Sequence, residues 1–285
     1  MSLVIDAHTH IFPPETLERR DHYANLDDTF RELYKDPKAK LATTPILLRD
    51  MKVHGVDVSV VMGIGWTDIG LAREANDYII ESVRNNNNKL VGFAGVNPLW
   101  GQAAAYEAER CAKAGLPGVG ELHPDTQGFS VTDPAILRPL MEVVRRFDLI
   151  FTIHTSEPVG HDYIGKGTVT PERIVRLIEN HPDVTFILAH WGGGLPFYSL
   201  MPEVAKILEK VYFDTAASPF LYDSRIFDIV AGIIGPNKIL LGSDYPLMPH
   251  SRLRTQIDQS SLSDADKRGI LGANAARILK YPRFN

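Results

Sequence analysis

Cysteine is almost absent from this chain, because Cys111 is the only one among 285 residues. A single cysteine excludes a disulfide within the chain and any metal site built from several thiolates. Long apolar runs are also missing, since no stretch approaches the roughly 18 residues that a membrane-spanning helix needs. Near the start, Asp6, His8 and His10 interrupt the apolar residues that a secretory signal would keep together. We therefore expect a cytoplasmic protein with no membrane partner.

An excess of positive charge is missing as well. The chain has 30 Lys and Arg against 35 Asp and Glu, which gives a formal net charge of −5 and a pI near 6.1. No nucleic-acid partner is expected, because there is no bulk basic field to attract one. The apolar share of 44% and the charged share of 23% are ordinary for a globular protein. The length suits one α/β barrel of about 250 residues, so residues 1–285 are predicted to form a single domain.

Eight short apolar runs with little polar alternation recur along the chain. They are Leu3–Ala7, Val56–Ile64, Leu90–Val96, Gly118–Leu122, Leu149–Ile153, Val184–Ala189, Val211–Asp214 and Ile239–Leu241. Such runs are typical of strands buried on both faces, and the stretches between them predict helices, among them Thr67–Asn85 and Leu195–Lys210. Eight strand–helix units predict an α/β fold, the (β/α)8 TIM barrel. The alternative, an open doubly wound sheet, would require a glycine-rich phosphate loop where this chain has Asp6–His10.

Two connections are longer than a crossover needs. The first is an insertion, Ile11–His54, which leaves the C-terminal end of the first strand and could therefore lie over the active face. The second, Ser156–Val169, contains glycines and a proline that indicate a loop, and its polar residues could face a pocket. A homodimer formed partly through the insertion is a further hypothesis.

His8 and His10 lie at the end of the first predicted strand. Side chains at i and i+2 of a strand point the same way, so both imidazoles can reach one ion. Single ionisable residues also end later strands. These are Glu121, His154, His190 and Asp244. Because the C-terminal ends of barrel strands converge on one pocket, all six are expected to meet there.

Histidines and carboxylates without thiolates suit zinc, and also manganese, iron or cobalt. Such an ion lowers the pKa of a bound water from 15.7 to about 7. Asp244, opposite the two histidines of the first strand, could ligate the ion and accept the proton of that water. His190 could polarise a substrate carbonyl, move a proton or bind a second ion, and the glycines of the run Gly192–Gly194 allow substrate or backbone to come close.

Five motifs together resemble the amidohydrolase superfamily, in particular the "amidohydrolase 2" branch with its aminocarboxymuconate-semialdehyde decarboxylase-like enzymes. They are Asp6–His10, His154, His190–Gly194, Gly242–Pro246 and Asn274–Arg277. The resemblance implies that His8, His10, His154 and Asp244 hold one metal ion and that His190 acts as acid or base.

Glu121 departs from many members of this branch, which carry no carboxylate at the fourth strand. The related TatD-type enzymes do carry a glutamate there, and it can bridge two metals. Our hypothesis is that Glu121 is a ligand and that the site can hold two ions, with His154 and His190 on the second. The alternative is that Glu121 pairs with a cation such as Lys166, or with a histidine.

Substrate contacts are expected from residues near these strand ends. The candidates are His123, His161, Tyr163, Lys166 and Trp191. For His123, a hydrogen bond that supports a ligand is the alternative, and for the residues of the Ser156–Val169 loop the alternative is plain surface.

Hydrolysis of a small-molecule ester, lactone, amide or related compound by a metal-activated water is the expected reaction, because Glu121 adds capacity for a second metal ion. The alternative is a non-oxidative decarboxylase, or a hydratase, of an unsaturated or aromatic carboxylate. That reaction would need a cation to hold the carboxylate, for which the sequence offers Arg252, Arg254 and Lys166.

Overall fold

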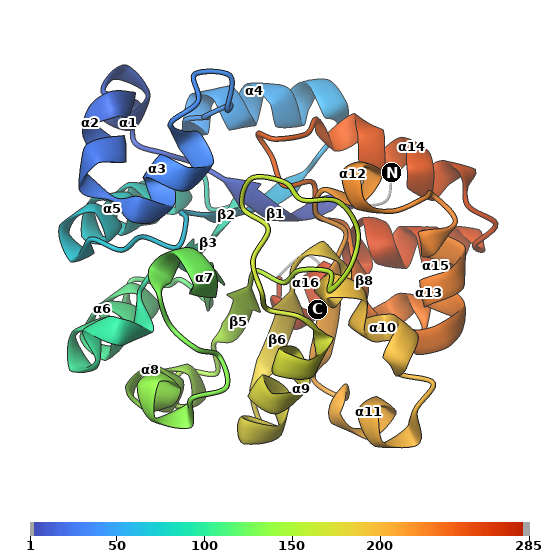
Figure 1. The fold of residues 1–285 in the computed structure, drawn as a ribbon. Helices are drawn as coiled ribbons and strands as arrows, with labels where there is room; N and C mark the ends of the chain where they lie inside the picture. Colours follow the sequence, from blue (N-terminus) through green and yellow to red (C-terminus); the bar gives the residue numbers. More distant parts are fainter. Residues whose placement is uncertain (1–2, 282–285) are drawn as a thin grey trace.

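A computed structural model describes residues 3–281. It contains one eight-stranded sheet in the order β1 to β8, in which every neighbouring pair is parallel. The strands are β1 Ile5–His10, β2 Val58–Met62, β3 Leu90–Ala94, β4 Gly118–Leu122, β5 Ile150–Ile153, β6 Thr185–Leu188, β7 Val211–Asp214 and β8 Ile239–Leu240. Figure 1 shows these strands at the centre with helices around them, so the predicted (β/α)8 TIM barrel is confirmed.

The segment 241–245 that follows β8 brings the barrel back to β1. The backbone N–H of Ala7 donates to the carbonyl of Leu241 at 2.7 Å, and that of His10 donates to the carbonyl of Tyr245 at 2.7 Å. A chain that continues β8 therefore lies directly beside the strand that carries the two histidines.

Helices follow the strands and surround the barrel. They are α1 Pro14–Glu18, α2 Arg20–Leu26, α3 Asp28–Tyr34, α4 Thr44–His54, α5 Ile69–Asn85, α6 Gln102–Lys113, α7 Pro124–Gln127, α8 Pro134–Arg146, α9 Pro171–Asn180, α10 Leu195–Tyr198, α11 Pro202–Ile207, α12 Ser218–Leu221, α13 Ile226–Ile234, α14 His250–Gln259, α15 Asp264–Arg268 and α16 Asn274–Ile278. Of these helices, α3 and α12 contribute residues to the cavity described below. None of the helices in the described residues is long and apolar enough to cross a membrane.

One predicted helix, Leu195–Lys210, is wrong in its extent. The structure divides it into α10 and α11, and Pro202 opens the second piece. Proline has no N–H for the helical hydrogen bond and clashes with the preceding turn, so it begins a helix more readily than it continues one.

The insertion after β1 is helical and packs on the barrel. Phe12 and Phe30 are fully buried, and the Phe30 ring stacks on Trp66 with centroids 5.8 Å apart. Buried Asp27 ties the insertion to the segment after β2, because its carboxylate accepts from the backbone of both Phe30 and Thr67. Burying large aromatic side chains contributes about 1.5–3 kcal/mol each, so the insertion is fixed to the barrel.

The segment Ser156–Val169 has no helix or strand and passes across the barrel mouth, as the yellow-green loop in Figure 1 shows. Both ends are tied down. The backbone N–H of Ser156 donates to the carbonyl of Val169 at 3.0 Å, and Thr168 donates to Asp125 at the start of α7. Both long connections therefore lie near the C-terminal ends of the strands, as expected.

Candidate metal centre and the cavity above it

His8 and His10 project from β1 with their Nε2 atoms toward the centre of the barrel. The Nδ1–H of His8 donates to the carboxylate of Asp214 at 2.8 Å, and that of His10 donates to the carbonyl of Gly63 at 2.7 Å. The two Nε2 atoms lie 3.1 Å apart. Since Nδ1 of each ring is engaged as a donor, Nε2 is the nitrogen that remains to bind a metal, which is how histidine ligands of metals are commonly oriented.

Six residues form two groups, and in each group the three ligand atoms lie within 4.8 Å of one another. The groups are His8, His10 and Asp244, and Glu121, His154 and His190. All six are the strand-end residues that the sequence predicts to meet. The resemblance implies His154 in one set with the β1 histidines, whereas the structure groups it with the residues of β4 and β6.

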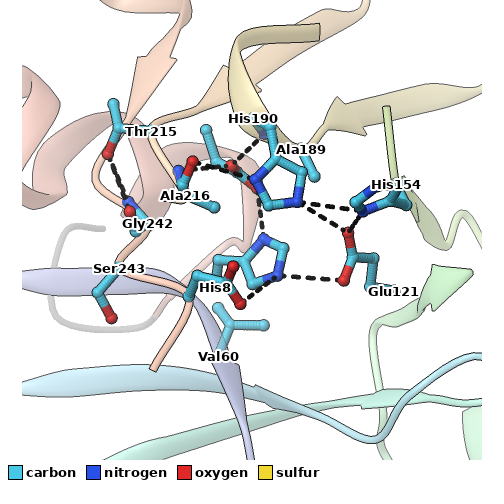
Figure 2. Close-up of polar contacts among 12 residues, drawn as sticks. His8, Val60, Glu121, His154, Ala189, His190, Thr215, Ala216, Gly242 and Ser243 are labelled. Atoms are coloured by element: carbon cyan, nitrogen blue, oxygen red, sulfur yellow. Dashed lines mark hydrogen bonds and ion pairs between the residues drawn. The ribbon is translucent and has the colours of Figure 1, made fainter. Parts of the chain in front are cut away.

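Glu121 contacts the histidines of both groups. Its Oε2 is 3.3 Å from His8 Nε2 and 3.6 Å from His10 Nε2. Its Oε1 is 3.1 Å from His154 Nδ1 and 3.5 Å from His190 Nε2 (Figure 2). Each carboxylate oxygen thus faces a different group, which is the arrangement that a shared ligand would adopt. Of the two alternative partners of Glu121, Lys166 is not used, because its ammonium bonds the carbonyls of Val159 and His161. Pairing with histidines does occur, as these distances show.

Asp214 at the end of β7 connects His8 to His190. One of its oxygens accepts from His8 Nδ1, and the other accepts from the backbone N–H groups of His190 and Ala216, both at 3.0 Å. The side chain is fully buried. No local pattern in the sequence predicts this role, because only the fold brings Asp214 behind His8 and His190.

The turn that begins at His190 has an unusual backbone. Every residue from His190 to Gly194 has a positive φ, between 56° and 88°. A Cβ on Gly192 would lie 2.7 Å from the Phe213 ring, and one on Gly193 would overlap the Ser156 carbonyl. The glycines therefore admit close backbone approach, as predicted. His190 keeps a conformation that side chains disfavour, and such strain is concentrated at functional sites.

Burial acts to raise the pKa of both carboxylates at the site, but the neighbouring histidines outweigh it. The positive charge at His8, with hydrogen bonds from nearby histidines, holds the pKa of Glu121 well below its usual value. Bonding to His10 and the charge at His8 lower the pKa of Asp244 to about 2. Both carboxylates therefore stay negative at neutral pH.

The histidines respond in the opposite direction. Burial acts to lower the pKa of His8, but the carboxylates of Asp214 and Glu121 raise it well above its usual value. Burial also acts to lower the pKa of His190, while its bond to Glu121 and the charge of that carboxylate raise it to about 9. The site thus has a field that attracts positive charge.

The donor set fits a divalent cation. Imidazole nitrogens and carboxylate oxygens without thiolates suit zinc and manganese alike. In addition, His154 Nε2 is buried and has no hydrogen-bond partner among the residues that the structure describes. Buried polar atoms are normally hydrogen-bonded or bound to a metal, and a group bound at the site could supply the missing partner.

A cavity of about 540 Å³ opens above these residues. His10, Glu121, His154, His190 and Asp244 form its polar floor. Its walls are largely apolar and include Leu33, Ile64, Ile164, Phe220, Leu221 and Leu247. Such a volume and lining are typical of small-molecule sites.

Three of the five expected substrate contacts line this cavity: His123, His161 and Tyr163. The His123 ring stacks on His154 at 4.1 Å and its Nε2–H donates to the carbonyl of Gly165 at 2.9 Å. Burial lowers the pKa of His123 to about 4, with the charge at His154 adding to the effect, so the ring is neutral at neutral pH.

The structure does not bring the other two to the cavity. Trp191 is fully buried, its indole N–H donates to Ser218 Oγ at 2.9 Å, and its ring packs on Phe227. The left-handed turn at His190 directs this side chain away from the floor. Lys166 turns to the carbonyls of its own loop, as described above.

The two arginines considered as clamps for a carboxylate also lie elsewhere. Neither is among the residues that line the cavity. Arg252 lies over the Phe220 ring at 5.0 Å, and Arg254 is directed to the carbonyl of His54. The cavity instead receives Tyr34, Lys38 and Lys40 from the insertion. These three residues do not lie at strand ends, so the pattern that predicts the metal ligands does not identify them. The sequence indicates only that the insertion is long and follows the C-terminal end of β1.

Comparison with known proteins identifies relatives over almost the whole chain. A family model described as amidohydrolase matches residues 5–281. The chain is 23% identical to 2-amino-3-carboxymuconate-6-semialdehyde decarboxylase of Dictyostelium discoideum over 334 residues, which covers 98% of this chain and 92% of that one.

Solved structures of two decarboxylases share the fold. The 5-carboxyvanillate decarboxylase from Sphingomonas paucimobilis superposes with a TM-score of 0.81 at 19% identity, covering 98% of this chain and 99% of that one. Dihydroxybenzoic acid decarboxylase from Polaromonas sp. JS666, solved with manganese and the inhibitor 2-nitroresorcinol, superposes with a TM-score of 0.76 at 22% identity, covering 99% and 98%.

These comparisons contradict hydrolysis, the reaction expected from the sequence. The relatives are named for decarboxylation, the reaction that the sequence left as the alternative. The expectation was wrong because a glutamate that could bind a second ion does not determine the reaction. One fold and one set of metal ligands can serve several different reactions. The role of Asp244 as acceptor of a proton from an attacking water is withdrawn with it.

Proposed function

This chain belongs to the amidohydrolase family, in the branch of aminocarboxymuconate-semialdehyde decarboxylase-like enzymes, and we propose that it is a metal-dependent, non-oxidative decarboxylase of an aromatic or unsaturated carboxylic acid. One observation carries the proposal most strongly: a floor of metal-binding side chains lies beneath a cavity with apolar walls. A flat, unsaturated acid matches both surfaces, because its ring or chain can contact the walls while its oxygens reach the floor.

His8, His10 and Asp244 would hold a divalent ion, with Glu121 Oε2 as a fourth donor. When bound, the ion stabilises negative charge on substrate oxygens. Zinc, expected from the sequence, and manganese, found in the Polaromonas relative, both suit these ligands. In this one-ion arrangement His154 orients Glu121 through the contact between its Nδ1 and Glu121 Oε1 at 3.1 Å.

His190 would supply the proton that the reaction requires. Breaking the bond between carbon and carboxylate releases carbon dioxide and leaves an electron pair on that carbon, which must take up one proton. The Nδ1–H of His190 donates to the carbonyl of Ala216 at 3.1 Å, which orients the ring so that Nε2 faces the floor. Nε2 would deliver the proton and then recover one from water.

A panel of acids and esters tests the reaction. Hydroxybenzoates and unsaturated dicarboxylates, each with its methyl ester, are incubated with the metal-loaded protein, and carbon dioxide and released alcohol are both measured. We expect carbon dioxide from at least one acid and no alcohol from its ester. Alcohol release without carbon dioxide from any acid would contradict the proposal.

His190 is tested with a matched histidine. We expect His190→Gln to lower carbon dioxide release about 100-fold or more, the usual worth of a positioned acid. The control is His22→Gln, which changes an exposed histidine of α2. Equal activity in both variants would remove His190 from the mechanism.

The number of metal ions bound per chain also tests the proton role of His190. We expect about one ion per chain by elemental analysis in the wild type, which leaves His190 free to carry a proton. About two ions in the wild type, falling to one or none in Glu121→Gln, would put His154 and His190 on a second ion and contradict the proton role.

A further inference from the structure

The insertion forms one side of the cavity through residues 32–40. Glu32, Asp36, Lys38 and Lys40 are exposed at its lip. Two acids and two lysines give this lip no net formal charge, so it does not select for an acid by itself. A residue that recognises the acid must lie deeper in the cavity.

Tyr34 is the residue of this segment whose position is best fixed. Its ring meets Phe12 edge to face at 5.0 Å and stacks on Phe30 at 5.4 Å, and both phenylalanines are fully buried. The Arg20 guanidinium donates to the backbone carbonyls of Tyr34 and Asp36 at 2.7 and 2.8 Å. Ring and backbone are therefore both held before any ligand arrives.

The Tyr34 hydroxyl has no hydrogen-bond partner among residues 3–281, although the side chain lines the cavity. Burial raises the pKa of this phenol, and the negative charges of Asp244 and Glu121 raise it further. The hydroxyl thus stays protonated and lies within the field of the carboxylates on the floor. It is a fixed donor without an acceptor in the chain.

Tyr163, the other tyrosine of the cavity wall, differs on this point. Its hydroxyl donates to the carboxylate of Glu157 at 3.0 Å, so its donor is already used within the loop. Of these two tyrosines, only Tyr34 therefore has a hydroxyl that is not already bonded within the chain.

We propose that the Tyr34 hydroxyl donates a hydrogen bond to an anionic oxygen of the substrate, and that Tyr34 is the residue through which the insertion recognises the acid. The oxygen belongs to a carboxylate or to a phenolate on the same ring. The inference rests on the proposed function, since it takes the ligand to be a flat carboxylic acid.

Binding of two inert probes tests the inference without relying on turnover. Benzoate offers a carboxylate, and pentafluorophenolate, which is ionised at neutral pH, offers only an anionic ring oxygen. The dissociation constant of each is measured by calorimetry on the metal-loaded protein. We expect Tyr34→Phe to weaken one or both probes at least about tenfold, the usual worth of a hydrogen bond to a charged group. The probe that loses affinity identifies the oxygen that Tyr34 contacts.

A control from the same insertion separates recognition from folding. Tyr23→Phe removes a hydroxyl that donates to Glu74, and Tyr23 is not among the residues that line the cavity. This variant is expected to bind the probes as the wild type does, and both variants to keep their metal content and melting temperature.

Unchanged affinity of Tyr34→Phe for both probes would overturn the inference, as would an equal loss in Tyr23→Phe or a wild type that binds neither probe. Carbon dioxide release is measured separately on the acid panel. A loss of binding in Tyr34→Phe with no acid decarboxylated would refute the proposed reaction and leave the recognition role standing.

Discussion

Replacing Asp214 by asparagine removes one negative charge behind His8 while nearly keeping the shape of the side chain. The carboxylate accepts three hydrogen bonds, two from backbone N–H groups through one oxygen and one from His8 Nδ1 through the other. In the amide, the single oxygen can keep the backbone pair. The new NH2 group then faces the Nδ1–H of His8, and two donors meet in a fully buried position.

His8 can relieve this conflict only by turning or by moving its proton to Nε2, the atom that faces Glu121 and His10. A lost hydrogen bond to a charged group is worth about 1.5–3 kcal/mol. At about 1.4 kcal/mol for each factor of ten, the expected loss of metal affinity is about 10- to 100-fold.

Metal affinity of Asp214→Asn is measured by competition with a chromophoric chelator at neutral pH. The control is Asp223→Asn, which changes an exposed aspartate paired with Arg225. Wild-type affinity in Asp214→Asn, or the same loss in the control, would refute the reasoning that His8 is held as a ligand by this carboxylate.

Two further predictions concern the stability of the barrel. Gly193→Ala forces a Cβ against the Ser156 carbonyl at a φ of 58°, so we expect the free energy of unfolding in urea to fall by about 1–3 kcal/mol. In the control Gly232→Ala, within α13, the new Cβ meets no atom within 4 Å, and the free energy of unfolding should rise by up to about 1 kcal/mol. Equal effects of the two would show that the turn is not strained. Burial acts to raise the pKa of Glu107, but bonding to Arg110 lowers it below its ordinary 4.5. Between this lowered pKa and the ordinary value, the unfolded chain binds more protons than the folded chain. The stability that Glu107 contributes is therefore fully present above about pH 4.5 and is lost as the pH falls through the lowered pKa. Unfolding free energy should therefore fall more steeply with acid in the wild type than in Glu107→Gln, and parallel curves would contradict this.

The barrel was predictable because its strands are buried on both faces and read as continuous apolar runs. The strands lie within or close to those runs, although β1 continues to His10 and so includes both histidines instead of ending before them. The convergence of Glu121, His154, His190 and Asp244 followed from the geometry of a barrel once the strands were assigned.

Residues that act through tertiary contacts were harder to find. His250 belongs to no motif in the sequence, yet it is buried, bonds Asp6 and stacks on Tyr245 with ring centroids 4.9 Å apart. Tyr34 belongs to an insertion whose path over the mouth depends on aromatic packing with Phe12 and Phe30, which local pattern does not reveal. The reaction was not predictable either, because the same ligands serve hydrolysis and decarboxylation.

Metal dependence of carbon dioxide release tests the central claim most directly. The protein is assayed with the acid identified from the panel, then after removal of divalent ions by a chelator, and again after addition of Zn²⁺ or Mn²⁺. We expect release to stop on removal and to return with at least one of the two ions. Undiminished release from the ion-free protein, or none from the loaded protein with any acid, would contradict a metal-dependent decarboxylase.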